Sequence, residues 1–413
     1  MRRETLLSLA SVVGIALAAC TDRSIVPPSS PVRPPTEARR TEATDDEQFD
    51  VPIAGLTKAQ LDRFNRGRDV FARVFTDATG LGPSFNSASC AGCHEEPSIG
   101  GTGDDLAEDV ETHVSVASGQ TCNDLAPHGG AVIQHHTTAA FQSQYPGYVS
   151  EAIPAEAGTH IGRRTTPMLF GFGLLEAVPA QTIIALADPT DANNDGVRGR
   201  PSMVGGALGR FGRKAMDPDL LGFNAGAFLM EIGVTSTMAS LEQLLAFADY
   251  PFDAGIDPMT GPEVSDEDLA LATDFVRFLR PVPQGRASAE ANDGRQLFNS
   301  VGCATCHVPS LRTGASPVAA LSNTNIAAFT DLLLHDMGPG LADICRGGAS
   351  AAEFRTEPLM GLRFRTRYLH DARSATLTDA IVQHGGEATK IVGRFSGLSA
   401  KQRDALIAYL NTL

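Results

Sequence analysis

Two short stretches of the chain share a pattern in which a histidine directly follows the second of two cysteines. They are residues 90–94 (CAGCH) and 303–307 (CATCH). The two thiols of such a pattern lie close together on one turn, so both can add to the vinyl groups of a single haem, and the adjacent histidine then reaches the iron. A zinc site would need two further ligands near each stretch, and none stands at a usual spacing. The pattern predicts two covalently bound c-type haems, attached through Cys90, Cys93, Cys303 and Cys306, with His94 and His307 as iron ligands.

The N-terminus has the features of a targeting segment. Arg2 and Arg3 precede an apolar run, residues 6–19, that is too short to cross a membrane. The run ends in LAAC, which resembles the bacterial lipoprotein signal. We therefore expect a signal peptide over 1–19, a lipid anchor on Cys20 and a disordered, proline-rich tether over 20–48. The predicted location is the bacterial cell envelope, facing the periplasm, with the outer membrane favoured because Thr21 follows the cysteine.

Cys122 and Cys345 remain once haem and lipid have taken the other five of the seven cysteines. An even remainder in an oxidising compartment favours a disulfide, which would tie the two halves of the chain together. The alternative is a pair of buried free thiols.

Composition excludes nucleic acid as a partner. The formal net charge is −15 over 413 residues, whereas nucleic-acid binding requires basic patches. An acidic surface suits a basic redox partner, and it also serves plain solubility. Hydrophobic residues make up 42% of the chain, enough for a sizeable core. No other stretch is long and apolar enough to span a membrane, so the expected membrane contact is the lipid anchor alone.

Each haem motif follows a helical segment of the form Gly-Arg-x-x-Phe, at residues 67–71 and 294–298. Each half also closes with an amphipathic helix, over 265–280 and 399–413. A first helix, a haem motif and a last helix are the minimum of a cytochrome c fold, in which the two helices cross. The sequence therefore predicts an all-α protein with two cytochrome c-type haem domains, 49–285 with a large loop-rich insert and 286–413.

Two features of the insert attract attention. Asp191, Asn193 and Asp195, followed by Gly196, match the first half of an EF-hand loop. Ser202 stands where the bidentate glutamate belongs, so a full EF-hand is excluded. A calcium site completed by other groups and an ordinary polar turn both remain open.

The second feature is a weak internal repeat. TPMLFG at residues 166–171 is similar to TEPLMG at residues 356–361. The glycines indicate a backbone that passes close to a bulky group, such as a haem, or two ordinary turns.

The chain resembles the bacterial di-haem oxidoreductases, also called di-haem peroxidases or thiol oxidoreductases, which are relatives of the di-haem cytochrome c peroxidases. In those relatives the C-terminal haem receives electrons and commonly has a methionine as second ligand, whereas peroxide reacts at the N-terminal haem. Met337 falls where the family has a Met-Gly pair, and the resemblance implies that it ligates the His307 haem; His335 and Met360 are the rivals. The resemblance rests on six stretches: 85–94, 166–195, 208–215, 331–340, 355–373 and 384–387.

The N-terminal haem has no obvious sixth ligand. The resemblance implies an open iron site that needs a distal acid-base group, and Glu176, beside the first repeat element, is the predicted residue. The alternative for Glu176 is a structural role at a helix end. The chain has no tryptophan, whereas the peroxidase relatives commonly have one between the haems. The candidate sixth ligands are His113, His128, His135, His136 and His160.

Three functions are open from the sequence. The favoured one is a peroxidase that reduces hydrogen peroxide at the N-terminal haem with electrons from a redox partner protein or a quinol-linked donor. The second is an electron-transfer cytochrome without substrate. The third is an oxidase or oxygenase that acts on an organic or protein substrate through high-valent haem. The large insert over the first haem favours the enzymes, because a carrier needs little beyond the minimal haem fold.

Overall fold

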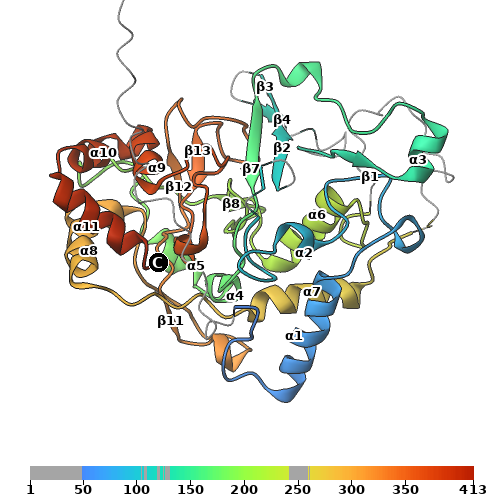
Figure 1. The fold of residues 1–413 in the computed structure, drawn as a ribbon, viewed down its shortest axis with the longest axis horizontal. Helices are drawn as coiled ribbons and strands as arrows, with labels where there is room; N and C mark the ends of the chain where they lie inside the picture. Colours follow the sequence, from blue (N-terminus) through green and yellow to red (C-terminus); the bar gives the residue numbers. More distant parts are fainter. Residues whose placement is uncertain are drawn as a thin grey trace, which may run out of the picture. The chain divides into compact units, whose positions relative to one another are not determined.

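The computed structural model describes residues 49–103, 105–106, 109–118, 121–123, 125, 131–240, 259 and 261–413 (Figure 1). The predicted signal peptide, Cys20, the tether and His128 lie outside these residues. All described residues belong to one compact unit. None of the helices in the described part is long and apolar enough to cross a membrane.

A pair of crossing helices is present in each half of the molecule (Figure 1). In the first half α1 (Lys58–Phe71) packs on α7 (Asp266–Phe278), and in the second half α8 (Ala289–Val301) packs on α11 (Ala400–Leu410). The Thr57 and Ser399 capping boxes that start α1 and α11 are both formed.

The glycine of each Gly-Arg-x-x-Phe segment is the point where the two helices cross. A Cβ atom on Gly67 would lie 2.1 Å from the carbonyl oxygen of Leu271, and one on Gly294 would lie 1.9 Å from that of Ala405. Only a residue without a side chain permits such a close approach. The repeated glycine therefore has a packing reason that is the same in both halves.

The all-α prediction is wrong. Of the described residues, 35% are helical and 13% are strand. The predicted loop-rich insert contains a three-stranded antiparallel sheet in the order β5–β2–β7, formed by Val132–Ile133, Val110–Val114 and Ile161–Thr165. These strands have two to five residues, too few for an alternating pattern to stand out from a loop in the sequence.

Among the described residues, the rest of the β structure consists of short two-stranded ladders and isolated bridges. The ladders are β1–β6 (Ser84–Phe85, His136–Thr137), β3–β4 (Val116–Ser118, Thr121–Asn123), β8–β9 (Met203–Val204, Ala207–Leu208), β10–β11 (Leu311–Arg312, Asn325–Ile326) and β12–β13 (Leu334–Asp336, Glu353–Arg355). The remaining α-helices are α2 (Cys90–Cys93), α3 (Ala139–Gln144), α4 (Phe172–Glu176), α5 (Ala180–Ile184), α6 (Leu220–Ile232), α9 (Leu377–Gln383) and α10 (Thr389–Ser396). The 3₁₀ turns are η1 (Asp77–Thr79), η3 (Ala155–Ala157), η5 (Cys303–Thr305), η6 (Ala319–Leu321), η7 (Leu362–Phe364) and η8 (Gly386–Ala388).

The two predicted domains share a hydrophobic core. One cluster of buried side chains combines Phe64 and Phe170 of the first half with Leu311, Leu333 and Phe364 of the second. A separate cluster surrounds the α8–α11 pair, and a third lies between α1, α6 and α7. The predicted boundary near residue 285 therefore separates the two helix pairs but passes through a common core.

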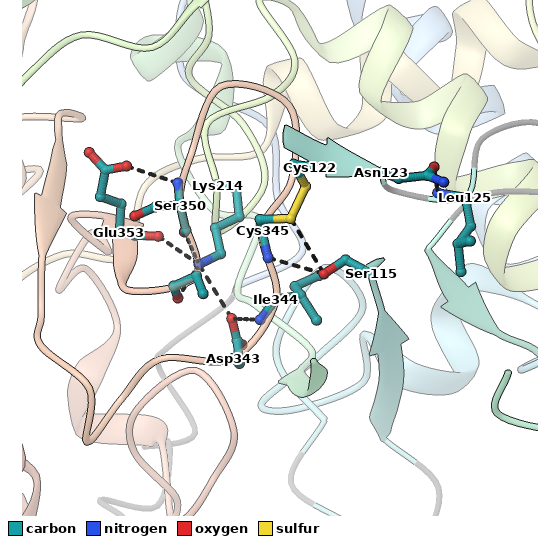
Figure 2. Close-up of a disulfide and its surroundings, with 11 residues drawn as sticks. Ser115, Cys122, Asn123, Leu125, Lys214, Asp343, Ile344, Cys345, Ser350 and Glu353 are labelled. Atoms are coloured by element: carbon teal, nitrogen blue, oxygen red, sulfur yellow. Dashed lines mark hydrogen bonds and ion pairs between the residues drawn. A yellow bond between two sulfur atoms is a disulfide. The ribbon is translucent and has the colours of Figure 1, made fainter. Parts of the chain in front are cut away.

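A disulfide joins the halves, as one of the two sequence interpretations predicts. Cys122 in β4 is bonded to Cys345 with an S–S distance of 2.02 Å and a Cα–Cα distance of 5.8 Å (Figure 2). The Ser115 hydroxyl accepts a hydrogen bond from the Cys345 backbone N–H at 3.2 Å. The bond closes a loop with a sequence separation of 223 residues, which restricts the unfolded chain.

A buried ion cluster adjoins this disulfide. Asp343, two residues before Cys345, pairs with Arg164 in β7. It also pairs with Lys214, whose Nζ lies 3.3 Å from Asp343 Oδ1 (Figure 2). The Lys214 ammonium also donates to the backbone carbonyls of Ser350 and Glu353. Asp343 is in the second half and both of its cationic partners are in the first, so removal of one partner by mutation would leave a buried charge uncompensated.

Candidate haem sites

Each cysteine-histidine motif lies in the wall of a cavity. The first cavity, about 410 Å³, is lined by Cys90, Cys93 and His94. The second cavity, about 250 Å³, is lined by Cys303, Cys306 and His307. The phenylalanine of each Gly-Arg-x-x-Phe segment lines the cavity of its own half. These residues are Phe71 and Phe298.

The local backbone brings each cysteine pair and its histidine together in the same way. His94 N–H donates to the Cys90 carbonyl at 3.0 Å, and His307 N–H donates to the Cys303 carbonyl at 3.0 Å. The first motif is the helical turn α2, capped by the Ser89 hydroxyl, and the second is the 3₁₀ turn η5. All four thiols are free.

Both histidines are prepared to bind a metal. His94 Nδ1 donates to the Gly101 carbonyl at 3.0 Å, and His307 Nδ1 donates to the Phe329 carbonyl at 3.0 Å. A carbonyl can only accept, so the proton is on Nδ1 and the lone pair of Nε2 is available to iron. Burial lowers the pKa of each imidazole to about 4, which keeps both neutral as a ligand must be. Two free thiols and one neutral imidazole per cavity fit one c-type haem each.

The weak internal repeat forms a wall between the two cavities. From Pro167 to Phe170 the side chains alternate: Pro167 and Leu169 line the first cavity, together with Thr166, whereas Met168 and Phe170 line the second. One short segment, just after strand β7, therefore contributes side chains to both cavities.

The second copy of the repeat packs against the first. Gly171 and Gly361 both have φ +77°. A Cβ atom on Gly361 would lie 2.4 Å from Met168 Sδ, and one on Gly171 would lie 3.3 Å from Met360 Cε. Protein atoms thus lie close to both glycines: Met168 lies beside Gly361, and Pro281, at 2.9 Å from a Cβ on Gly171, lies closer to it than Met360 does. The predicted closeness of the two glycines to haem stays a prediction.

The first cavity contains two carboxyl groups that contact each other. Glu111 in β2 and Glu231 in α6 are joined by a side-chain hydrogen bond. Asn86 Nδ2 donates to Glu231 Oε2 at 3.0 Å, and His113 Nε2 lies 3.1 Å from Glu111 Oε2. Burial raises the pKa of Glu111 to about 6. Burial and the charge of Glu111 together raise the pKa of Glu231 well above its ordinary value, so the pair holds a proton at neutral pH.

Sequence reasoning did not find this pair. A single carboxyl group near the end of the otherwise apolar helix α6, at Glu231, was the available signal. Glu111 lies in a five-residue strand of the insert, and nothing local distinguishes it from other polar residues there.

The structure places Glu176 outside both cavities. Its Oε2 lies 2.7 Å from Arg277 Nε, and its Oε1 accepts from the Leu220 N–H at 2.9 Å. Glu176 therefore connects the ends of α4 and α6 to α7. This position gives no support to its predicted role as the distal acid-base group, because the carboxylate is held by a cation away from His94 and lines neither cavity.

Met337 and both of its rivals line the second cavity. His335 is engaged on both ring nitrogens, by Glu387 at 2.8 Å and by Asp331 at 2.9 Å. Such a ring has no free lone pair for iron. Met360 lies beside Gly171 in the same wall, and Met337 stays the predicted ligand.

The glutamates of the second cavity differ from those of the first. Glu357 Oε2 lies 2.8 Å from Arg213 Nη1 and 2.8 Å from Arg355 Nη2. Burial opposes ionisation of Glu357, but the charges of Arg213 and Arg355 prevail and hold its pKa below the ordinary value. Glu357 is therefore an ionised carboxylate, unlike the Glu111–Glu231 pair.

The histidines that the sequence offered as sixth ligands are dispersed. His135 and His136 line the first cavity, with His135 Nε2 at 3.2 Å from Thr112 Oγ1. His113 is buried against Glu111, and His160 lines neither cavity.

In the candidate calcium loop the side-chain oxygens accept from backbone N–H groups of their own turn. Asp191 accepts from Gly196, Asn193 from Asp195 and Asp195 from Val197. The polar-turn interpretation accounts for these contacts, and calcium binding stays a prediction.

Comparison with known proteins agrees with the two-haem geometry. The profile of the family described as "Di-haem oxidoreductase, putative peroxidase" matches residues 139–413. No curated protein matches the chain. Solved structures with a similar fold include hydrazine synthase from Kuenenia stuttgartiensis, which is 15% identical, with 94% of this chain and 99% of that chain covered and a TM-score of 0.40.

Two further structures are similar to the same degree. A MauG-like protein associated with microbial copper homeostasis is 16% identical, with 89% of this chain and 92% of that chain covered and a TM-score of 0.40. The diheme peroxidase BthA from Burkholderia thailandensis is 13% identical, with 85% and 86% covered and a TM-score of 0.40. Identity at this level carries no residue-by-residue argument, whereas the family profile covers well over half of the chain. The protein belongs to the di-haem oxidoreductase family.

Proposed function

We propose that this oxidoreductase is a peroxidase that reduces hydrogen peroxide to water in the first cavity, with electrons that enter through the second. The observation that carries the proposal is the Glu111–Glu231 carboxyl pair in the cavity of His94. Reduction of one peroxide consumes two electrons and two protons and forms two water molecules. Haem supplies the redox chemistry of this reaction when it is bound.

The carboxyl pair can both accept a proton from peroxide and donate a proton to it. Ionised Glu111 accepts a proton from one peroxide oxygen, and protonated Glu231 donates a proton to the other oxygen as the O–O bond breaks. The hydrogen bonds from Asn86 to Glu231 and between Glu111 and His113 hold the two carboxyl groups in place. No such proton holder is available at Glu357 in the second cavity, whose carboxylate is ionised and bound to two arginines.

The electron entry site is proposed at the second cavity because it offers thioether groups. A methionine ligand favours ferrous iron and raises the reduction potential, as an electron-receiving haem requires. Met337 is the proposed ligand. The donor is a redox partner protein or a quinol-linked donor.

Covalent haem attachment and location are part of the same proposal. The four free thiols in the cavity walls support thioether bonds to the two haems. The apolar N-terminal segment and Cys20 support a lipid anchor on a periplasm-facing protein. Haem that stays with the chain after denaturation, and a mass increase of two haems, are the expected results of mass spectrometry.

The decisive experiment compares Glu111→Gln and Glu231→Gln with Glu290→Gln, an exposed glutamate in α8 that lies in neither cavity. The full chain with both haems is reduced, and its reoxidation by peroxide is followed by stopped-flow absorption. Each cavity variant should lose about 10²–10⁴-fold in rate, and Glu290→Gln should lose none. Wild-type rates in both cavity variants would refute the proposal, and so would a protein whose two haems ignore peroxide.

The Glu176→Gln variant tests which residue has the acid-base role, Glu176 or the Glu111–Glu231 pair. A loss of rate as large as that of Glu231→Gln, without a loss of stability, would return the acid-base role to Glu176.

A further inference from the structure

Two buried threonines occupy equivalent places beside the two iron-binding histidines. Gly101, whose carbonyl accepts from His94, is followed by Thr102, and the Thr102 hydroxyl donates to the Thr166 carbonyl at 2.6 Å. Phe329, whose carbonyl accepts from His307, is followed by Thr330. The Thr330 hydroxyl donates to the Thr356 carbonyl at 2.6 Å. Thr102 and Thr330 are both 0% exposed.

The peptide unit that accepts the imidazole proton is fixed at its other end as well. The N–H of Thr102 donates to the Glu96 carbonyl at 2.6 Å, and the N–H of Thr330 donates to the Val308 carbonyl at 3.1 Å. Each unit thus binds the histidine through its C=O and the segment just after the histidine through its N–H. The threonine hydroxyl then holds this peptide unit against the wall between the cavities. Its acceptor, the carbonyl of Thr166 or Thr356, belongs to the first residue of a repeat element.

This equivalence is one of geometry and not of sequence spacing. The accepting carbonyl lies 7 residues after His94 but 22 residues after His307. Two segments of such different length converge on the same set of hydrogen bonds. The arrangement at the histidine is therefore what the two halves have in common, and the intervening chain differs.

We propose that Thr102 and Thr330 are positioning residues that set the reduction potentials of the two haems, each for its own iron. A firm Nδ1–H···O=C bond makes the imidazole a more electron-rich ligand, which favours ferric iron and lowers the potential. Loss of the threonine hydroxyl frees the peptide unit, weakens that bond and raises the potential of one haem. The inference rests on the proposed haem binding and is independent of the peroxidase reaction.

The test uses Thr102→Val, Thr330→Val and the two serine variants in the full chain with both haems. Potentiometric titration followed by absorption measures each potential without peroxide. Thr330→Val should raise the potential of the His307 haem alone and Thr102→Val that of the His94 haem alone, while serine restores the wild-type values. Thr412→Val is the matched control, because its buried hydroxyl also donates to a backbone carbonyl, that of Tyr409 at 2.7 Å, and Thr412 lines neither cavity.

Several outcomes would overturn the inference. They are an unchanged potential at the adjacent haem in a folded valine variant, an equal shift of both potentials, or the same shift in Thr412→Val. If a valine variant loses its haem, the alanine variant at that position is measured instead and must show the same one-sided rise. If the wild-type chain bound no haem, the proposed function would be refuted without any variant. A slow peroxide reaction combined with one-sided potential shifts would refute the peroxidase and leave this inference intact.

Discussion

The two cavities share the side that carries the histidine and differ on the walls that face it. On the shared side, each has a cysteine-histidine turn, a phenylalanine from a crossing helix, an imidazole tied to a backbone carbonyl and a threonine behind that carbonyl. On the remaining walls, the first cavity has two carboxyl groups that retain a proton, and the second has thioethers and carboxylates paired with cations. An internal repeat can therefore provide two similar haem sites while substitutions on the opposite walls give them different chemistry.

The largest expected effect is on the reaction with peroxide, and it should differ between variants of the two cavities. His94→Ala should abolish the reaction with peroxide. His307→Ala should still permit one reaction of the reduced protein, because the first cavity is intact. The loss in His94→Ala should exceed the roughly 10–100-fold that removal of an outer-shell partner costs. Stopped-flow spectra after one equivalent of peroxide measure both. If His307→Ala alone lost the reaction, the roles of the two cavities would be reversed.

Removal of the bond between the halves tests whether the cavities depend on it. Changing both Cys122 and Cys345 to serine should lower the free energy of unfolding by about 2–5 kcal/mol, because the unfolded chain is no longer restricted. Denaturant unfolding with haem absorption as a probe measures the loss. We expect the spectra of both haems to be unchanged before unfolding. A change in one haem only would show that the disulfide shapes that cavity.

The helix crossings offer a matched pair of variants. Gly67→Ala and Gly294→Ala each place a Cβ about 2 Å from a carbonyl of the partner helix, so each should destabilise by about 1–3 kcal/mol. Circular dichroism during thermal unfolding measures the two losses, and alanine at the exposed Gly393 of helix α10, where nothing lies within 4 Å of a Cβ, controls for overpacking. A tolerated alanine at either crossing would contradict the packing reason for the repeated glycine.

The smallest effect concerns pH. Glu111 must be ionised to accept a proton, and burial raises its pKa to about 6. The peroxide rate should therefore fall about tenfold per pH unit below 6. It should fall again at high pH as Glu231 loses its proton, since a raised pKa keeps that group protonated only up to its own value. Glu111→Gln should remove the acidic limb of the profile. Persistence of that limb in Glu111→Gln would assign it to another group.

Local patterns in the sequence predict the shared side of the cavities well. The cysteine-histidine turns, the crossing helices and the disulfide follow from residues close in the chain or from counting cysteines. The repeat at 166–171 and 356–361 is also visible, although the reason for its glycines is not.

The walls that differ between the two cavities could not be predicted from the sequence, because they are formed by residues that are far apart in the chain. The ion pair of Glu176 with Arg277, 101 residues later, cannot be inferred from the residues around Glu176 in the sequence. Glu111 and Glu231 meet only because a short strand and a buried helix line the same cavity. The strands themselves are two to five residues long, and their pairing partners define them more than their own sequence does.

The disulfide between Cys122 and Cys345 has a consequence for how the protein is made. The proposed covalent haem attachment sets two opposite requirements for six thiols: Cys122 and Cys345 have to be oxidised, whereas the four motif thiols have to stay reduced until they react with haem. An oxidant that closes the long-range bond also closes a pair of thiols three positions apart, and a motif disulfide blocks haem attachment. Cys345 follows both motifs in the chain, so the proposed addition of haem to the motif thiols can precede closure of the bond. Recombinant production should therefore supply haem and a thiol reductant early and the oxidant last.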